Sequence, residues 1–350
     1  RPEIIKISPF VKGALRRGWN FFVIHTGQHY SDIMDEVFRE TFSMPEPKYN
    51  LEVGSGTHAE QVGKMMMGIE KVLLEEKPDY VCVYADLNSS LAGALSAAKL
   101  NIPIIQLEGG LRSYDRRMPE EVNRVVVDRL ASYLFAPTQL QKEHLEKEGI
   151  TENIFVVGNL IADVVKDVLP KALQADKIRE RLGLENGKYF LATIHRPAAV
   201  DNPENFKKLL SGLALVATHY KWPVIYPIHP RSKKNLDAFG FSLPSGIRLI
   251  EPLGYVDFLS LASQSKVILS DSGSIQEEAL IMQVPLVSLR ENTERPESLE
   301  IGSNVLAGFE PETILEKAKM MAERRRDWRH PYGENVAEKM LDILEEKLEL

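Results

Sequence analysis

Ten apolar runs recur along the 350-residue chain, with charged, helix-like segments between them. They form two series of five: residues 21–27, 79–85, 102–108, 133–138 and 154–159, then residues 189–195, 222–229, 247–252, 266–271 and 284–289. The runs are continuous rather than alternating, as expected of strands that are covered on both faces. Strands that alternate with helices in this way predict parallel α/β sheets.

A charged segment at residues 169–188, LPKALQADKIRERLGLENGK, ends in a turn signal and divides the two series almost evenly. At 350 residues, of which 44% are hydrophobic, the chain can bury the cores of two domains of ordinary size. We therefore predict two doubly wound domains with a cleft between them.

Charge and composition exclude several classes of partner. The formal net charge of -7 and the absence of a sustained Lys/Arg stripe argue against nucleic acid, since the basic cluster at residues 323–330 is short. No apolar stretch approaches the length of a membrane span, and no leader opens the chain. The single cysteine, Cys82, excludes an internal disulfide framework and fits a reducing cytoplasm. Because the chain opens with RPEIIKISPF, without Met or a strand, we expect the natural protein to be slightly longer.

Open parallel sheets bind ligands beyond the carboxyl ends of their strands, so the residues that follow each apolar run are candidates for a site. Any one of them could be an ordinary turn or capping residue, but their concentration on one edge favours a functional site. They are His25, Gly27, Gln28, His29, Asp86, Glu108, Gly109, Gly110, Asn159, His195, Arg196, His229 and Ser272.

The stretch ILSDSGSIQEEAL at residues 268–280 passes from a buried strand to the start of a helix. Free amides at that helix N-terminus favour an anion such as phosphate, and Gly273 lets it approach the backbone. On the first turns, one of Glu277 and Glu278 could bind a ribose diol while the other faces solvent. An ordinary N-cap by Ser272 or Ser274 is the alternative.

Two other patterns do not predict a cofactor or metal. Gly54, Gly56 and Ala59 match the form of a dinucleotide fingerprint, but the candidate acid Asp79 precedes its strand instead of ending it, which argues against NAD. There is no Walker A or HExxH pattern, and Gly27 interrupts the helix that would align His25 and His29. The sequence predicts no metal site.

Acidic residues gather in the first half of the chain. In EGGLRSYDRRMPEEVNR, residues 108–124, Glu108 ends a strand and Pro119 opens a helix with Glu120 and Glu121 in its first turn. Proline and acids are also typical of a structural helix start. Together with Asp86, and with His195 in the other domain, these acids nevertheless predict a cleft with several proton carriers.

The motifs RPEIIKISP, TGQHY, DLNSSLAGALSAAK, EGGLRSYDRRMPEEVNR, TIHRP, DSGSIQEEA and RENTERPE, in this order, closely resemble the non-hydrolysing UDP-N-acetylglucosamine 2-epimerases over nearly the whole chain. The resemblance implies a GT-B-like α/β fold of two Rossmann-like domains, with an N-terminal domain at 1–165, a C-terminal UDP-binding domain at 166–332, and a final helix at about 333–350 that returns to the first. It also implies a UDP-sugar substrate, no cofactor, a homodimer and a part in polysaccharide biosynthesis.

The resemblance also assigns residues. The catalytic residues would be Asp86, Glu108, Glu121 and His195. The residues that bind UDP or the sugar would be Arg1, Arg112, Ser272, Gly273, Ser274 and Glu278. Residues of a second nucleotide-sugar site, or of cleft closure, would be Gln28, His29, Arg196 and His229. An Arg-Gln pair of that second site is absent, so the sequence leaves allosteric activation open.

The implied reaction inverts C2 of UDP-GlcNAc by elimination of UDP to a 2-acetamidoglucal and readdition, which gives UDP-ManNAc. We expect Glu108, Glu121 and Asp86 to share the C2 proton work, and His195 to assist the departing phosphate. Three positions depart from the family pattern, namely Leu87, Gln106 and Ala199. A related UDP-sugar, a GT-B glycosyltransferase reaction and a non-catalytic UDP-sugar sensor are the alternatives.

Overall fold

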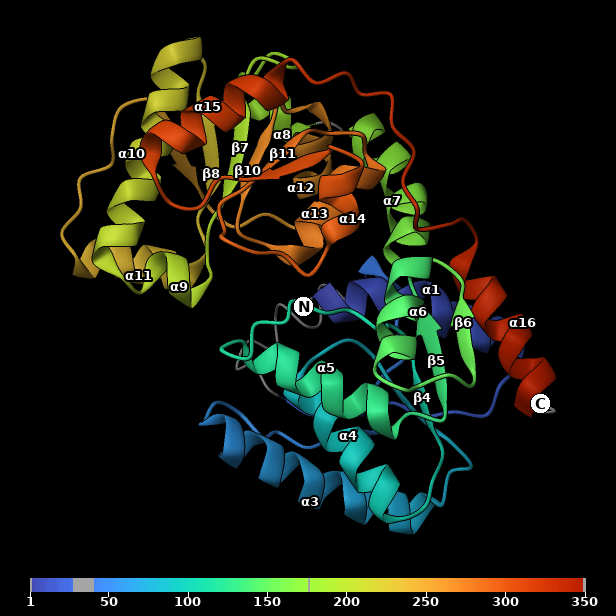
Figure 1. Cartoon of the computed structure of the whole chain (residues 1–350). Coiled ribbons are helices and arrows are strands. Elements are labelled where there is room, and N and C mark those ends of the chain that lie inside the picture. The colour runs from blue at the N-terminus through green and yellow to red at the C-terminus, as the bar shows by residue number, and fades with distance from the viewer. Residues whose placement is uncertain (1, 28–40, 176, 349–350) are drawn as a thin grey trace. The chain divides into compact units, whose positions relative to one another are not determined.

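The computed structural model describes residues 2–27, 41–175 and 177–348. The chain forms two compact units, one of Arg1–Val164 with Pro331–Leu350 and the other of Val165–His330 (Figure 1). We call them unit 1 and unit 2. None of the described helices is long and apolar enough to cross a membrane.

Unit 2 contains a six-stranded sheet in which every neighbouring pair of strands is parallel. Its elements are α8 (Lys177–Arg181), β7 (Phe190–Thr193), α9 (Pro197–Val200), α10 (Pro203–Tyr220), β8 (Val224–Pro227), α11 (Pro230–Ala238), β9 (Ile247–Ile250), α12 (Tyr255–Gln264), β10 (Ile268–Ser270), α13 (Gly273–Ile281), β11 (Leu286–Ser288), α14 (Pro296–Glu300), β12 (Asn304–Leu306) and α15 (Pro311–Ala322). The strand order is β12-β11-β10-β7-β8-β9, so the winding reverses between β7 and β10. That reversal is the topological switch point, where doubly wound folds bind ligands.

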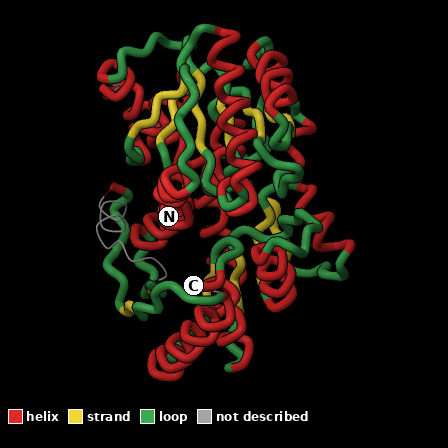
Figure 2. The backbone as a smooth tube through the Cα atoms, turned by 90° about the vertical axis from the view of Figure 1, so that its left-hand side faces the viewer, coloured by secondary structure: helices red, strands yellow, loops and turns green. Residues whose placement is uncertain are grey.

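Successive residues of the unit 2 strands point to opposite faces of the sheet, and both faces are buried. On β7, Phe190 packs in one core cluster with α10 and α15, whereas the next residue, Leu191, packs in another with α12 and α13. Helices therefore flank the strands on both sides (Figure 2). Burial on both faces explains why these strands read as continuous apolar runs.

Unit 1 has a four-stranded parallel sheet of order β3-β4-β5-β6 and a separate parallel pair, β1-β2. Its elements are α1 (Pro2–Arg16), β1 (Ile24–His25), β2 (Tyr49–Asn50), α3 (His58–Glu76), β3 (Val81–Val83), α4 (Asn88–Lys99), β4 (Ile104–Gln106), α5 (Pro119–Leu130), β5 (Tyr133–Ala136), α6 (Gln139–Lys147), β6 (Ile154–Val156) and α16 (Val336–Leu348). Helix α7 (Ile161–Ala175) begins in unit 1 and continues into unit 2.

Helices cover both faces of the four-stranded sheet as well. Ile104 of β4 packs with α3, α4 and α5, whereas Ile105 packs with α1 and α16. Helix α16 lies directly on α1, where a Cβ added to Gly13 would lie 2.3 Å from Leu341 Cδ1. Arg17, just after α1, pairs with three acids of α16, which are Glu338, Asp342 and Glu345. The C-terminal helix is therefore an integral part of unit 1.

The predicted fold class is confirmed: each of the ten apolar runs contains a strand, although the strands are shorter than the runs. Two strands, β2 and β12, were not predicted. Among the described residues β1 pairs only with β2, so the first predicted strand does not join the main sheet of unit 1. The glycine-rich stretch before α3 ends in a capping box, in which Thr57 and Glu60 bind each other's backbone amides.

Candidate active site

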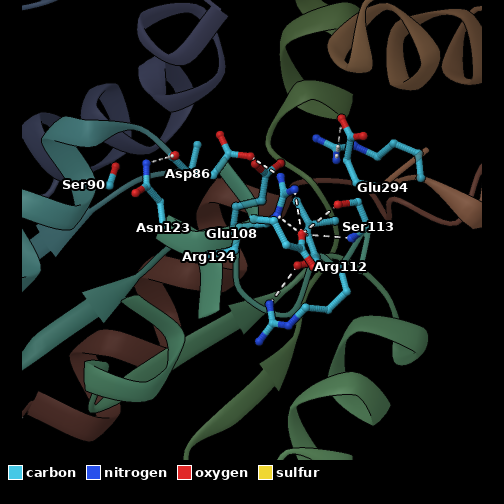
Figure 3. Close-up of polar contacts among 12 residues, drawn as sticks. Asp86, Ser90, Glu108, Arg112, Ser113, Asn123, Arg124 and Glu294 are labelled. Carbon is cyan, nitrogen blue, oxygen red and sulfur yellow. Dashed lines mark hydrogen bonds and ion pairs between the residues drawn. The ribbon is translucent and has the colours of Figure 1, made fainter. Parts of the chain in front are cut away.

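Four polar side chains lie at or near the carboxyl edge of the unit 1 sheet. Asp86 follows β3, Glu108 follows β4 and Asn159 follows β6, while Glu121 lies in the first turn of α5. Because parallel strands place their carboxyl ends on one edge, residues separated by more than 70 positions in the sequence come together there. Figure 3 shows the polar contacts of this group.

Glu108 is buried, with 5% of its surface exposed, and its carboxylate is held on one side only. Oε1 accepts hydrogen bonds from Lys6 Nζ at 3.1 Å and from Asn159 Nδ2 at 3.0 Å. Within the described part of the chain, Oε2 accepts none. The carboxylate thus has one oxygen fixed by donors and one available to a ligand.

Glu121 is held much more completely. Its two oxygens accept hydrogen bonds from the amides of Ser113 and Tyr114, at 2.9 and 2.8 Å, from the Ser113 hydroxyl, and from Arg124 Nε and Nη2 at 3.0 and 2.8 Å. Burial opposes ionisation, but these donors outweigh it, and the pKa of Glu121 lies below its usual value. The remaining Nη1 of Arg124 pairs with Asp86. One buried guanidinium therefore links two of the predicted catalytic acids.

Arg112 contacts the same loop near its glycine pair, Gly109 and Gly110. Its Nε and Nη2 form a bidentate pair with Glu148 at 2.8 and 2.7 Å, and Nη1 binds Asp128 Oδ2 at 2.6 Å and the Leu111 carbonyl at 2.8 Å. Asp128 Oδ2 also accepts the Gly110 amide at 3.0 Å. Through these contacts Arg112 supports the glycine turn after Glu108, and its binding to UDP or the sugar stays a prediction.

Unit 2 has its own group of candidate residues, which lies at the topological switch point of its sheet. His195 follows β7, and Asp271 follows the neighbouring strand β10. Asp271 is fully buried; its Oδ2 accepts the amides of His195 at 2.8 Å and Arg196 at 2.7 Å, and its Oδ1 lies 3.1 Å from His195 Nδ1. Burial raises the pKa of Asp271, but the imidazole and the amides more than offset it, so the pKa is lowered. The carboxylate directs Nδ1 of His195 inward and leaves Nε2 for a ligand. The His195 ring also lies against His229, with ring centroids 5.4 Å apart.

Helix α13 begins beside the pair formed by Asp271 and His195, which we call the dyad, and no side chain caps its first amides. Ser272 is its N-cap residue, and its side chain forms no capping hydrogen bond. A Cβ added to Gly273 would lie 2.4 Å from Glu294 Oε1 and 3.6 Å from Arg196 Nη2, so a larger residue there would displace the Glu294 side chain. Glu294 pairs with Arg290 at 2.7 Å and lies within 4 Å of Arg196 and Arg295. The three guanidinium groups are balanced by nearby carboxylates, since Arg295 also pairs with Glu277. The helix dipole and the free amides at the start of α13, rather than a net positive charge, therefore favour an anion.

Comparison with known proteins identifies the family of the chain. The family model for UDP-N-acetylglucosamine 2-epimerase matches residues 14–345. The chain belongs to the UDP-N-acetylglucosamine 2-epimerase family. The UDP-N-acetylglucosamine 2-epimerase of Methanocaldococcus jannaschii is 47% identical over 98% of this chain and 96% of that protein.

Solved structures agree. A crystal structure of the M. jannaschii epimerase in complex with UDP-GlcNAc and UDP matches with a TM-score of 0.93 and 46% identity, covering 98% of this chain and 97% of that one. A family member of different specificity, the Pseudomonas aeruginosa UDP-2,3-diacetamido-2,3-dideoxy-D-glucuronate 2-epimerase, is 37% identical over 91% of this chain and 89% of that protein. The chain is an epimerase of the GT-B-like fold.

The burial of the adjacent glutamates Glu277 and Glu278 differs from the prediction made from the sequence. The expectation that one of them faces solvent is wrong, because both are buried. Glu277 Oε1 accepts a 2.5 Å hydrogen bond from Arg295 Nε. Glu278 lies near Tyr255, whose pKa is raised well above its usual value by burial and then by that carboxylate. Glu277 is therefore a structural ion-pair partner, and Glu278 remains the candidate for the ribose.

The remaining predicted residues fall into three groups. Ser274 lies in the first turn of α13, half-buried. Arg196 and His229 both lie beside the dyad, and His229 caps α11 through Nδ1, which accepts the Arg231 amide. The predictions for Arg1, Gln28 and His29 fall outside the described residues.

The structure shows where the three residues that depart from the family pattern lie. Leu87 occupies the N-cap position of α4 without a side-chain cap. Gln106 is fully buried, and its Nε2 donates to the carbonyls of Ala85 and Glu108, at 3.3 and 3.4 Å, so it ties two strand ends together. Ala199 packs into the unit 2 core.

Sequence reasoning overlooked three residues that hold the acids and the histidine, Lys6, Arg124 and Asp271, and also Glu294, which pairs with Arg290 beside α13. Each lies inside a quoted motif, but only the fold shows which side chain it reaches. Among the described residues, no group of three or more His, Cys, Asp or Glu is arranged to hold a metal ion.

Proposed function

We propose that this family member interconverts UDP-GlcNAc and UDP-ManNAc by anti-elimination of UDP and readdition. The M. jannaschii relative, solved with UDP-GlcNAc and UDP, supports the substrate class. The residues of each unit support the chemistry, because unit 1 offers carboxylates, whereas unit 2 offers helix-start amides beside a histidine.

The reaction must break two bonds. The C2 hydrogen is not beside a carbonyl, so its removal alone would leave an unstabilised carbanion. When the C1–oxygen bond breaks, its electron pair leaves with UDP, the C2 proton passes to a base, and a C1–C2 double bond forms the 2-acetamidoglucal. Protonation of C2 from the opposite face and readdition of UDP to C1 give the epimer, with no net oxidation or reduction.

Glu108 is the best candidate for a carboxylate that exchanges the C2 proton. Its Oε2 accepts no hydrogen bond from the described residues, whereas both oxygens of Glu121 accept hydrogen bonds. For Glu121 to exchange a proton, the amides of Ser113 and Tyr114 would first have to release it. In the described conformation Glu121, with Arg124, fixes that loop and the position of Asp86.

The leaving group is the task of unit 2. Amides at the start of α13 and the nearby guanidinium groups would stabilise the diphosphate as negative charge develops on it. His195 Nε2 would donate to a phosphate oxygen, since Asp271 holds the opposite ring nitrogen at 3.1 Å. Glu278 would bind the ribose diol. Arg1, implied by the family resemblance, remains a predicted phosphate ligand.

The observation that carries the proposal is the buried carboxylate of Glu108, which has donors on one oxygen only. It stands in a chain that is 47% identical to the M. jannaschii epimerase. The test is proton NMR of UDP-GlcNAc incubated with the full-length protein in deuterated water. Deuterium at C2 together with a UDP-ManNAc signal is expected. Binding of the nucleotide sugar without C2 exchange would refute the proposal and favour a sensor or a glycosyltransferase.

A related sugar is the second candidate, because the P. aeruginosa relative with 37% identity acts on a UDP-2,3-diacetamido uronate. Parallel assays of that sugar and UDP-GlcNAc distinguish the two: the better substrate has the higher kcat/KM for C2 exchange. We also propose a homodimer, which light scattering of the purified chain would test.

A further inference from the structure

Asn159 contacts Glu108, the candidate base. It is one of the strand-end candidates of the sequence, but the family resemblance assigns it neither a catalytic role nor a contact with UDP or the sugar. It is buried, with 3% of its surface exposed, and follows β6 just before α7. Its Nδ2 donates to Glu108 Oε1 at 3.0 Å. This contact joins residues 51 positions apart in the sequence.

The orientation of the Asn159 carboxamide is determined by its other contact. Oδ1 accepts the backbone amide of Ile161 at 3.1 Å at the start of α7. A backbone N–H can only donate, so a flipped carboxamide would place two donors against each other. Nδ2, and not Oδ1, must therefore face Glu108.

The backbone of Asn159 is fixed as well. Its amide donates to the Tyr332 carbonyl at 3.0 Å, and its own carbonyl accepts the Ala162 amide at 2.9 Å. Tyr332 belongs to the short segment that enters α16. With backbone and carboxamide both held, the Nδ2 donor is preorganised and needs no rearrangement when substrate binds.

Both donors to Glu108 act on the same oxygen. Lys6 Nζ, from α1, lies 3.1 Å from Oε1, where Asn159 also donates. Two donors on Oε1 restrict the rotation of the carboxylate, which fixes where Oε2 lies. The other charged groups at this sheet edge include Asp86 and Glu121, and both of them pair with Arg124.

We propose that Asn159 is a positioning residue for the epimerisation, which holds the Glu108 carboxylate in place and aims its Oε2 at the C2 proton. The proposal rests on the proposed function, because it assumes that Glu108 exchanges that proton. Asn159 itself touches no reacting atom in this role.

Two substitutions separate the contact with Glu108 from the helix cap. N159S retains an oxygen that can accept the Ile161 amide but removes the donor to Glu108. N159D also retains the cap, and it replaces the donor by a carboxylate oxygen facing Oε1 of Glu108. Asn202 offers a matched control, since it caps α10 by accepting the amides of Glu204 and Asn205 in unit 2. N202S and N202D change a cap in the same way, away from Glu108.

The measurement is the rate of deuterium incorporation at C2 of UDP-GlcNAc as a function of pH, with UDP affinity measured by calorimetry. In N159D a carboxylate oxygen replaces the donor and repels Oε1 of Glu108, so the base loses its position and kcat should fall about 50-fold or more, further than in N159S. In N159S, kcat should fall about 5- to 20-fold, as expected when one buried donor is lost, with little change in pH dependence.

UDP affinity should stay within about twofold in both variants, because the proposed phosphate site is in unit 2. The Asn202 controls should match the wild type. An N159D kcat equal to that of the wild type, or equal losses in N159D and N202D, would overturn the positioning role. If N159D does not fold, an N159S kcat equal to that of the wild type overturns it. A wild-type protein without C2 exchange would instead refute the proposed function.

Discussion

Gly158, next to Asn159, offers the sharpest test of how the C-terminal segment docks on unit 1. Its φ is +112°, and a Cβ added there would lie 2.1 Å from the Tyr332 carbonyl oxygen and 2.7 Å from Val336 Cγ2. Neither neighbour can easily move, since the first is backbone and the second lies in the buried first turn of α16. We therefore predict that Gly158→Ala separates the segment before α16 from the end of β6.

The expected cost has two parts. A positive φ in a residue with a Cβ costs about 1–2 kcal/mol, and the overpacking adds about 1–3 kcal/mol. The smaller entropy of the unfolded alanine chain returns about 0.4–1 kcal/mol. Gly158→Ala should thus destabilise unit 1 by about 2–4 kcal/mol, which is large against the stability of an ordinary domain.

The control is Gly149→Ala in the same unit, where φ is +78° and no atom lies within 4 Å of the added Cβ. It carries the backbone cost without the clash, so it should lose only about 1 kcal/mol. Urea unfolding gives the two free energies, and hydrogen exchange of residues 331–348 reports whether α16 loosens. Equal destabilisation by the two substitutions, with unchanged exchange in α16, would refute the steric argument.

Three further substitutions test the candidate site. Arg124→Lys removes the two guanidinium contacts that help to lower the pKa of Glu121. C2 exchange should therefore fall about tenfold at pH 6 and less at pH 8. Arg129→Lys on the same helix is the control. Asp271→Asn should lower kcat about 100-fold, with UDP affinity by calorimetry within about threefold, because it releases the histidine ring. Gly273→Ala, whose Cβ would lie 2.4 Å from a glutamate oxygen, should weaken UDP binding about tenfold or more. Gly63→Ala, with open space around its Cβ, should not.

Each of these predictions has a definite contrary result. A uniform loss at every pH in Arg124→Lys would mean that the guanidinium does not set the ionisation of the acids. Unchanged kcat in Asp271→Asn would remove the dyad from the reaction. Equal UDP affinities in the two glycine variants would mean that the start of α13 does not bind the phosphates.

The sequence by itself determined the layers and the strand-end residues. Continuous apolar runs predicted strands with two buried faces, and Phe190 and Leu191 do pack on opposite sides of their sheet. Strand ends are legible because they carry polar residues directly after apolar ones. Asp86, Glu108 and His195 were found in this way, since local order along the chain is enough to locate a strand end.

Tertiary structure alone decided which side chains hold the others. The partners of Glu108 are Lys6 and Asn159, 102 and 51 positions away in the sequence. No local pattern encodes such a contact, because it depends on strand order and on how α1 and α7 leave the sheet. The same reason explains why Glu277 and Glu278 could not be sorted by sequence: burial is a property of packing, and it made both of them interior residues.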